Sequence, residues 1–298
     1  FDAGSYNHYI YGNWTNNGTF IYGTSTLYFV GTVNIYIGTS SFYNVVFGGT
    51  GSVFATGSLT IYGDVTINNY FDAGSFVHYV YGNWFNNGTF VYGTSTITFV
   101  GTVNLFISTN EFYNVVFAGS GTYTATGSIT FYGNVTINNY FDAGTFVHFI
   151  YGNWIVNGTF VYGTSTIHFL GSGNIFIGIS NYYHIIFAGT GTVTATGSLT
   201  IWGDVTINNY FDAGSFAHYV YGNWINNGTF VYGTSTIYFS ATVNIYINTN
   251  EFYNVVFAGT GNYVATGSIT FYGSVTINNY FDAGSFTHYV YGNWTVNG

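Results

Sequence analysis

The chain contains no lysine and no arginine, and it also lacks proline, cysteine and methionine. Binding to nucleic-acid phosphates or to anionic lipid headgroups depends on basic side chains, so neither nucleic acid nor a charged membrane surface is expected as a partner. The nine acidic residues give a formal net charge of −9 over 298 residues, and only 3% of the residues are charged. This is a dilute negative charge rather than an acidic binding patch.

Long hydrophobic runs are missing as well, since Gly, Asn or Thr interrupts every stretch of about 18 residues. We therefore expect no transmembrane helix and no membrane insertion. The first residue is Phe1 and no signal peptide is present, so we interpret the chain as a mature product, a fragment or a window on a longer protein. An extracellular protein without cysteine has no disulfides, and a continuous hydrogen-bonded ladder would have to stabilise it.

The sequence consists of a 70-residue repeat that is rich in Gly, Tyr and Phe. A fixed period of this kind is typical of solenoids and other stacked arrays. The motif Phe-Asp-Ala-Gly marks the start of each copy, without insertions, at Phe1, Phe71, Phe141, Phe211 and Phe281. We expect one continuous solenoid made of the repeats 1–70, 71–140, 141–210 and 211–280 and the partial repeat 281–298.

Hydrophobic residues within a repeat alternate with a period of two, which is typical of β-strands. In the segment 57–70, for example, Leu59, Ile61 and Val65 alternate with polar or aromatic residues. Helix signals are missing, so the chain is predicted to be all-β. Turn motifs rich in Gly and Asn separate further strand candidates at 76–84, 94–101, 103–107 and 112–119.

The favoured fold is a β-solenoid, or parallel β-helix, with about three coils per 70-residue repeat. In the second repeat the coils would span 74–92, 93–118 and 119–143, so that the first coil would be shorter than the other two. Strands stack about 4.8 Å apart, so one repeat would rise roughly 14 Å. An antiparallel sandwich or an array of hairpins is the alternative, because it would also need turn motifs every 8–12 residues or so.

One histidine and one tryptophan recur at fixed positions in every repeat. Copies about 14 Å apart cannot share a metal ion, whose ligands lie about 2 Å from it, so no metal site is expected. His184 stands where other copies have Asn, and we interpret it as a tolerated surface variant. The recurring residues are predicted to form a structural ladder: His8, His78, His148, His218, His288, Trp14, Trp84, Trp154, Trp224 and Trp294.

The acidic residues are distributed among the repeats. Asp64 and Asp204 are replaced by Asn134 and Ser274 in the other copies, and Glu111 and Glu251 also have Ser or Asn counterparts. Catalytic carboxylates of glycosidases lie about 5–9.5 Å apart, so we expect no catalytic residue and no cofactor, and predict that the chain is not an enzyme. The Asp of each Phe-Asp-Ala-Gly motif is predicted to cap a turn with its own side chain; these are Asp2, Asp72, Asp142, Asp212 and Asp282.

Asparagine heads several N-x-Ser/Thr sequences, which are acceptor sites for N-linked glycans in secreted proteins. The alternative is a structural role, because Asn suits left-handed turns and can form hydrogen-bonded ladders between stacked coils. Outward tyrosines such as Tyr62, Tyr132 and Tyr272 leave a similar choice, between stacking along the solenoid and contact with carbohydrate or neighbouring fibres. The candidate glycosylation sites are Asn13, Asn17, Asn87, Asn134, Asn157, Asn227 and Asn293.

The segments 12–20, 57–69 and 92–102, together with the Phe-Asp-Ala-Gly-Ser motif, resemble repeats of large secreted bacterial surface proteins. These are adhesin-like β-solenoids rich in Gly, Asn and Thr. The resemblance implies an extracellular or cell-surface location and a role in adhesion or scaffolding. The leading hypothesis is a structural segment of an extracellular filament that self-associates and is a candidate for glycosylation. The alternative is an adhesin-type module that binds polysaccharide or a host surface through exposed aromatic and Asn residues.

Overall fold

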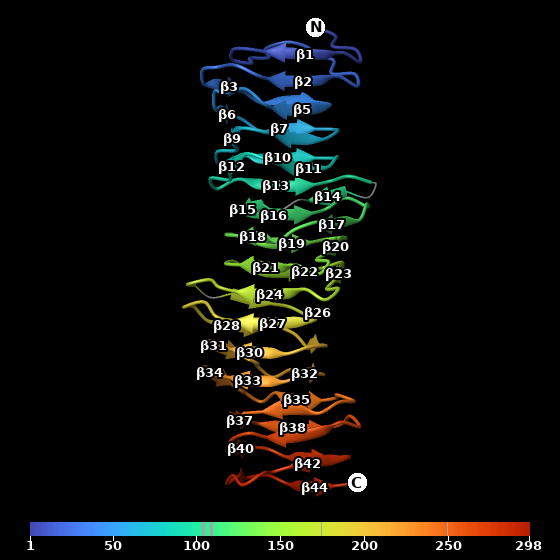
Figure 1. The fold of residues 1–298 in the computed structure, drawn as a ribbon, viewed down its shortest axis with the longest axis vertical. Coiled ribbons are helices and arrows are strands. Elements are labelled where there is room, and N and C mark those ends of the chain that lie inside the picture. The colour runs from blue at the N-terminus through green and yellow to red at the C-terminus, as the bar shows by residue number, and fades with distance from the viewer. Residues whose placement is uncertain (103–104, 108–109, 174, 249) are drawn as a thin grey trace. The chain divides into compact units, whose positions relative to one another are not determined.

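The computed structural model describes residues 1–102, 105–107, 110–173, 175–248 and 250–298. In this part of the chain all regular secondary structure is β, and the strands pair in parallel in a β-solenoid of about 15 turns (Figure 1). The predicted all-β solenoid is confirmed, and the antiparallel alternative is wrong. The chain divides into two units, Phe1–Phe146 with Asn157–Val161, and Val147–Val156 with Tyr162–Gly298.

The first unit has three sets of stacked strands. One sheet consists of β1 (Asn7–Ile10), β2 (Thr26–Phe29), β5 (Asn44–Phe47), β8 (Val65–Ile67), β11 (Trp84–Asn86), β14 (Leu105–Ile107), β17 (Tyr123–Ala125), β20 (Tyr140–Asp142) and β23 (Thr159–Val161). The second set consists of β4 (Ser40–Phe42), β7 (Leu59–Ile61), β10 (Val77–Val80), β13 (Thr96–Phe99), β16 (Asn114–Phe117) and β19 (Val135–Ile137). The third set consists of β3 (Ile35–Ile37), β6 (Val53–Ala55), β9 (Tyr70–Asp72) and β12 (Thr89–Val91), and of the separate pair β15 (Asn110–Phe112) and β18 (Ile129–Phe131).

The second unit is built in the same way. One set consists of β21 (Val147–Ile150), β24 (Thr166–Phe169), β27 (His184–Phe187), β30 (Val205–Ile207), β33 (Trp224–Asn226), β36 (Ile245–Ile247), β39 (Asn262–Ala265) and β42 (Tyr280–Asp282). Another consists of β26 (Ser180–Tyr182), β29 (Leu199–Ile201), β32 (Ala217–Val220), β35 (Thr236–Phe239), β38 (Asn254–Phe257), β41 (Val275–Ile277) and β44 (Trp294–Val296). The last consists of β22 (Trp154–Val156), β25 (Ile175–Ile177), β28 (Val193–Ala195), β31 (Tyr210–Asp212) and β34 (Thr229–Val231), and of the separate sheet β37 (Asn250–Phe252), β40 (Ile269–Phe271) and β43 (Tyr289–Val290).

After the first coil, which holds only β1, each coil contributes one strand to each of the three sets, and a coil is about 19 residues long. The strand pairing shows this length directly, because Val77 pairs with Thr96 of the next coil, and Thr96 pairs in turn with Asn114. The two longer coils expected at 93–118 and 119–143 are therefore wrong. The sequence marks where turns occur, but only the pairing of strands shows which turns close a coil.

One 70-residue repeat makes three and two-thirds coils rather than a whole number. In the second unit, strand β21 recurs one repeat later as β32 and again as β43, which is eleven strands each time, at three strands per coil. As a result, these three equivalent strands lie in three different sheets. With strands about 4.8 Å apart, one repeat rises about 18 Å instead of the expected 14 Å or so.

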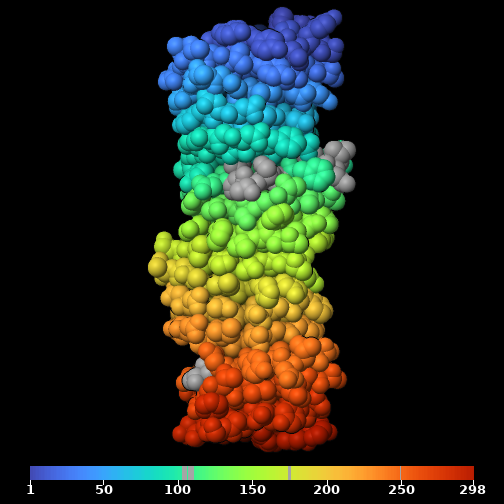
Figure 2. All heavy atoms as spheres, in the orientation of Figure 1, coloured from blue at the N-terminus to red at the C-terminus, as the bar shows by residue number. Residues whose placement is uncertain are grey.

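Alternate residues of each strand point into the coil and form the core. In β2, for example, Leu27 and Phe29 are buried while their neighbours are partly exposed. Core rings of successive coils stack, as in the pair Phe47 and Phe71, whose centroids are 4.2 Å apart with planes 5° from parallel. Burying a side chain of this size stabilises the fold by about 1.5–3 kcal/mol. In the space-filling view the chain colours follow one another in bands within each unit, because each coil covers the one before it (Figure 2).

Candidate functional site

The Phe-Asp-Ala-Gly motif forms a tight corner between two strands. Asp72 accepts a hydrogen bond of 2.8 Å from the backbone N–H of Gly74, and Gly74 has a φ of 64°. This left-handed backbone favours glycine, which has no Cβ to clash. The predicted turn-capping role of the aspartate is confirmed, and the same hydrogen bond recurs at Asp2, Asp142, Asp212 and Asp282.

A histidine after the corner ties it to the preceding coil. His78 is only 1% exposed, its Nε2 lies 2.9 Å from the carbonyl oxygen of Ala73, and its Nδ1 accepts a hydrogen bond of 3.1 Å from the backbone N–H of Leu59. A carbonyl only accepts and an amide N–H only donates, so the ring is neutral with its proton on Nε2. Burial lowers the pKa of His78 and likewise that of His218. His218 and His288 make both contacts in the same way.

The recurring histidines and tryptophans do not stack on one another within either unit. His78 pairs with Ile97 in the next coil, and Trp84 lies between Val65 and Ile107. Because a repeat is not a whole number of coils, equivalent side chains in one unit reach different sheets. Each of these residues pairs with a residue of another type in the neighbouring coil, and the structural role predicted for them stays a prediction.

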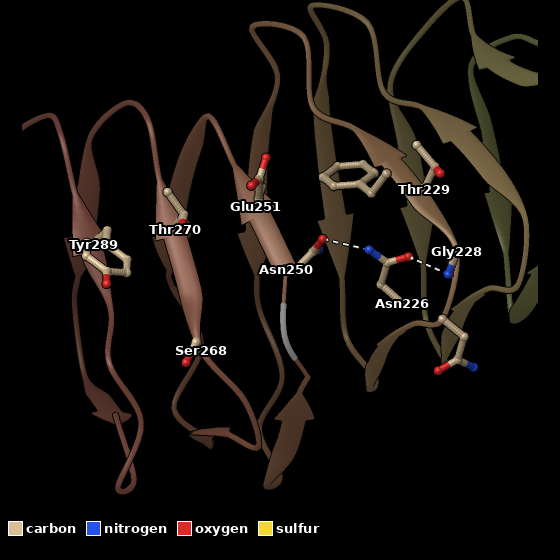
Figure 3. A pocket seen from close by; sticks show the side chains of 10 residues that line it. Asn226, Gly228, Thr229, Asn250, Glu251, Ser268, Thr270 and Tyr289 are labelled. Carbon is tan, nitrogen blue, oxygen red and sulfur yellow. Dashed lines mark hydrogen bonds between the residues drawn. The ribbon is translucent and has the colours of Figure 1, made fainter.

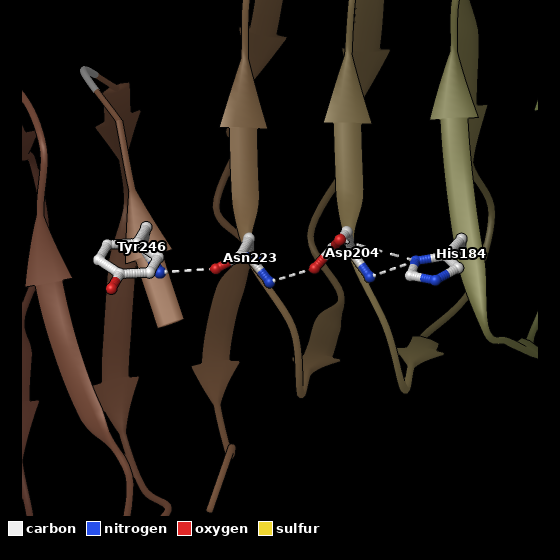
Figure 4. A network of polar contacts seen from close by, with 4 residues as sticks. All are labelled: His184, Asp204, Asn223 and Tyr246. Atoms are coloured by element: carbon white, nitrogen blue, oxygen red, sulfur yellow. Dashed lines mark hydrogen bonds and ion pairs between the residues drawn. The ribbon is translucent and has the colours of Figure 1, made fainter. Parts of the chain in front are cut away.

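A ladder of a different kind links four consecutive coils of the second unit (Figure 4). His184 Nδ1 accepts the backbone N–H of Asp204 at 2.9 Å, and Asp204 Oδ1 accepts the backbone N–H of Asn223 at 2.8 Å. Asn223 Oδ1 in turn accepts the backbone N–H of Tyr246 at 2.8 Å. Each side chain thus satisfies a backbone donor of the coil that follows. His184 Nδ1 also lies 3.9 Å from Asp204 Oδ2.

The first unit has the same arrangement, with Asn44 in the place of His184. Asn44 Oδ1 accepts the backbone N–H of Asp64, Asp64 accepts that of Asn83, and Asn83 accepts that of Phe106, over 2.7–3.0 Å. The interpretation of His184 as a tolerated surface variant missed this role. The sequence does hold a signal for it, because every copy carries a hydrogen-bond acceptor at these positions.

The outward tyrosines stack face to face along each unit. Tyr232 stacks on Tyr272 with centroids 5.1 Å apart, and Tyr272 stacks on Tyr291 at 5.4 Å. In the first unit Tyr62 lies between Tyr22 and Tyr81 at 4.9 and 5.0 Å. Such pairs contribute about 0.5–1.5 kcal/mol beyond the area that they bury. The geometry favours the stacking interpretation of these side chains, and Tyr132 follows it by stacking on Tyr92.

A groove opens where a sheet is interrupted in the second unit (Figure 3). Strands β34 and β37 belong to different sheets, and between them lies a groove of about 530 Å³. The coil here is longer than usual, because Trp224 pairs with Val205 of the preceding coil but with the more distant Ile247 of the next. The lining includes Asn226, Asn227, Thr229, Asn250, Glu251 and Thr270. The equivalent residues of the first repeat line a groove of about 430 Å³, which includes Asn16, Thr19, Ser40, Ser41, Ser58 and Thr60.

Asparagines build one wall of the groove in the second unit. Asn226 donates through Nδ2 to Asn250 Oδ1 at 2.8 Å, and its backbone N–H donates to Asn248 Oδ1 at 2.8 Å. Asn248 returns a hydrogen bond of 2.9 Å to the carbonyl oxygen of Asn226. Asn250 is only 6% exposed, and its Nδ2 has no acceptor among the described residues. Glu251 is exposed at the rim, and the described residues hold no cluster of three or more groups that could bind a metal ion.

All seven candidate glycosylation sites are exposed or partly exposed. They fall into two groups. In the Asn-Gly-Thr sequences the asparagine lies in the loop before the interrupted strand, and Asn227 itself lines the groove. Asn17, Asn87 and Asn157 hold the equivalent positions in the other repeats. By contrast Asn13, Asn134 and Asn293 occupy positions of the polar ladder, where Asn13 Oδ1 accepts the backbone N–H of Tyr36.

No family model, curated protein or solved structure matches the chain. Among the residues that the structure describes, no helix is long and apolar enough to cross a membrane.

Proposed function

We propose that the chain is a structural segment of an extracellular or cell-surface filament that forms by self-association. The observation that carries this proposal is the use of the polar side chains. Asp72 and His78 hold corner backbone groups, and Asp204 and Asn223 hold backbone groups between coils. These residues serve the stacking of coils, which is the role that a filament needs.

The outer surface supports the same proposal. Stacked rings such as Tyr232, Tyr272 and Tyr291 reinforce the contacts between coils on the outside, as the core does on the inside. The low content of charge limits repulsion between neighbouring molecules. Self-association through such aromatic and Asn-rich surfaces would make the chain its own principal partner.

The absence of an enzymatic activity belongs to this proposal. The carboxylates of Asp72 and Asp204 accept backbone hydrogen bonds within the solenoid, so they are not arranged as a catalytic pair. Glu251 is an exposed carboxylate beside asparagine and threonine rather than beside a second acid in the groove. We propose no catalytic residue and no cofactor.

Assembly of the purified full-length chain tests the proposal. Strands lie across the axis of a solenoid, so we expect filaments in electron micrographs and a reflection near about 4.8 Å along the filament axis in fibre diffraction. Particles that stay monomeric at every concentration would contradict it.

Location is tested on intact source cells by brief proteolysis and mass spectrometry of the released peptides. Trypsin cannot cut a chain without Lys and Arg, so an aspartate-directed protease is the suitable reagent.

A second candidate function is an adhesin-type module that binds polysaccharide. The groove beside Asn226 and Asn250, with its hydroxyl and amide lining, favours it. Retention of the full chain on immobilised polysaccharides, against retention on an underivatised matrix, tests this function separately from assembly.

A further inference from the structure

The groove at the interrupted sheet is a built feature of the repeat. It recurs at the same repeat position in the first and fourth copies, although Ser40 and Ser41 stand in one and Asn250 and Glu251 in the other. In both copies one side of the groove is the segment that begins with the Asn-Gly-Thr sequence. The other side is the strand that follows in the next coil, β4 in the first copy and β37 in the fourth. In both copies the coil beside the groove is long, since Trp14 pairs with Ile37 and Trp224 with Ile247.

The lining of the groove, with Glu251 at its rim, suits a hydroxyl-rich ligand that carries no negative charge. Thr229, Thr270 and Ser268 present hydroxyl groups, Asn226 and Asn227 present amides, and Phe230 forms an apolar part of the surface. The chain has no Lys or Arg, so an anionic ligand such as a phosphate would meet no counter-charge. A cavity of about 530 Å³ lies within the size range of sites that hold small ligands.

One buried donor in this wall still needs an acceptor. Asn250 is 6% exposed, and its Oδ1 is engaged by Asn226 while its Nδ2 has no acceptor among the described residues. Leaving a buried donor without a partner is destabilising, because the group has lost its hydrogen bond to water. In Figure 3 the Asn250 side chain points towards Asn226 across the groove wall. A ligand hydroxyl or carbonyl oxygen placed there would satisfy this amide.

The rim of the groove carries an attachment point for a sugar. Asn227 heads the sequence Asn227-Gly228-Thr229, it is exposed, and it lines the groove. Its Nδ2 donates a hydrogen bond of 3.1 Å to Asn208 Oδ1. An amide nitrogen carries two hydrogens, so one can be replaced by a glycosidic bond while the other keeps this contact.

We propose that the groove is a seat for one neutral sugar ring, a pyranose with an acetamido or hydroxyl group that accepts from Asn250 Nδ2. The ring comes either from a glycan linked to Asn227 or from an external polysaccharide. Both sources present the same hydroxyl-rich chemistry. The seat is independent of filament formation, so either proposal can fail without the other.

The external source is tested with the full chain made in a host that does not glycosylate it. The probes are N-acetylglucosamine and its β-1,4-linked dimer, and saturation-transfer NMR reports their binding at millimolar concentration. The double variant Thr60→Trp/Thr270→Trp fills both grooves, and we expect it to lower the signal about tenfold, as expected when binding loses about 1.4 kcal/mol. Thr276→Trp, on the outward side of β41 and away from the groove lining, is the matched control and leaves the signal unchanged.

The linked source is tested with the chain secreted by a glycosylating host. Glycopeptide mass spectrometry measures occupancy at Asn227, and an endoglycosidase measures how fast its glycan is released from the folded chain. We expect release from Asn227 to be slower than from Asn134, which lies in the polar ladder, and Thr270→Trp to remove the difference. Release at equal rates, or an unoccupied Asn227, together with no loss of probe signal in the double variant, would overturn the proposal.

Discussion

The backbone N–H of Leu59 is hydrogen-bonded to the imidazole of His78 rather than to a carbonyl of the neighbouring coil. The backbone N–H of Asn223 likewise donates to a side chain, the carboxylate of Asp204, rather than to a carbonyl of the neighbouring coil. At the residue scale, polar side chains in this chain complete backbone hydrogen bonds where the coil turns a corner. An unmade bond at a buried position would cost about 1–3 kcal/mol, which explains why these corners carry such residues.

Acidification should destabilise the fold through the buried histidines. Burial lowers the pKa of His78 and His218 below the ordinary value of about 6.5. Above that value neither the folded nor the unfolded state binds the proton, so stability is constant. Below it the unfolded state binds protons more readily, and the free energy of unfolding falls with pH until the folded-state pKa is reached. Urea unfolding at pH 7.5 and at pH 5 measures this loss.

The control for this measurement separates the histidines from stability in general. His78→Leu/His218→Leu should lower stability at neutral pH, because the N–H groups of Leu59 and Leu199 lose their acceptor, and should flatten the pH dependence. Ile97 pairs with His78 in the neighbouring strand. The variant Ile97→Val should lower the free energy of unfolding by about 0.5–1.5 kcal/mol and keep the full pH dependence. An unchanged pH dependence in the double leucine variant would show that other groups are responsible.

The hydrogen bonds that run from His184 through Asp204 to Asn223 allow a test by isosteric replacement. Asp204→Asn keeps an oxygen where the N–H of Asn223 needs one, and the second repeat has Asn134 at this position. We expect it to change the free energy of unfolding by less than about 0.5 kcal/mol. Asp204→Leu removes the acceptor and should cost about 1 kcal/mol. Chemical denaturation of the two variants decides the matter, and equal stabilities would mean that water replaces the carboxylate at this half-exposed site.

At the element scale, the sequence was sufficient for the strands and their inward faces but not for the coil. The alternation of Leu59, Ile61 and Val65 predicts the strands β7 and β8 and their buried residues. The turn motifs look alike at every corner, so the sequence could not show that a coil closes after about 19 residues. The groove escaped prediction for the same reason, since it depends on the long step by which Trp224 pairs with Ile247.

Stacked corner glycines provide a test of the coil at this scale. Gly233 has a φ of 54°, and a Cβ placed on it would lie 2.1 Å from the carbonyl oxygen of Gly214 in the preceding coil. Left-handed backbone costs a non-glycine residue about 1–2 kcal/mol, and the clash adds to this, so we expect Gly233→Ala to lower the free energy of unfolding by more than about 2 kcal/mol. Gly178→Ala is the matched control, because its Cβ would approach only the Thr196 hydroxyl, at 3.9 Å.

Denaturation of both glycine variants in parallel measures the difference. Reduced freedom of the unfolded chain would by itself raise the stability of both variants by about 0.4–1 kcal/mol, so an equal change at Gly233 and Gly178 would contradict the predicted clash. A larger loss at Gly233 shows that two coils meet there at their closest approach, as the structure has it.

At the scale of the whole molecule, the repeat and the coil have different periods. Within the second unit, β21, β32 and β43 are copies of one strand that lie in three different sheets. Any feature that occurs once per repeat, such as the Asn-Gly-Thr loop, is therefore presented on each side in turn. A filament of this kind would expose its Asn-Gly-Thr loops all around its axis rather than along one edge.

This mismatch predicts the helical symmetry of the assembled filament. If the geometry within each unit continues along a filament, successive repeats are related by a rise of about 18 Å and a rotation of two-thirds of a turn beyond three full coils. The pattern returns to the same side only after three repeats, or eleven coils, which is about 53 Å. Helical reconstruction from electron micrographs measures both quantities. A rise of about 14 Å without rotation, as three whole coils per repeat would give, would contradict the register found here, because every equivalent strand would then lie in the same sheet.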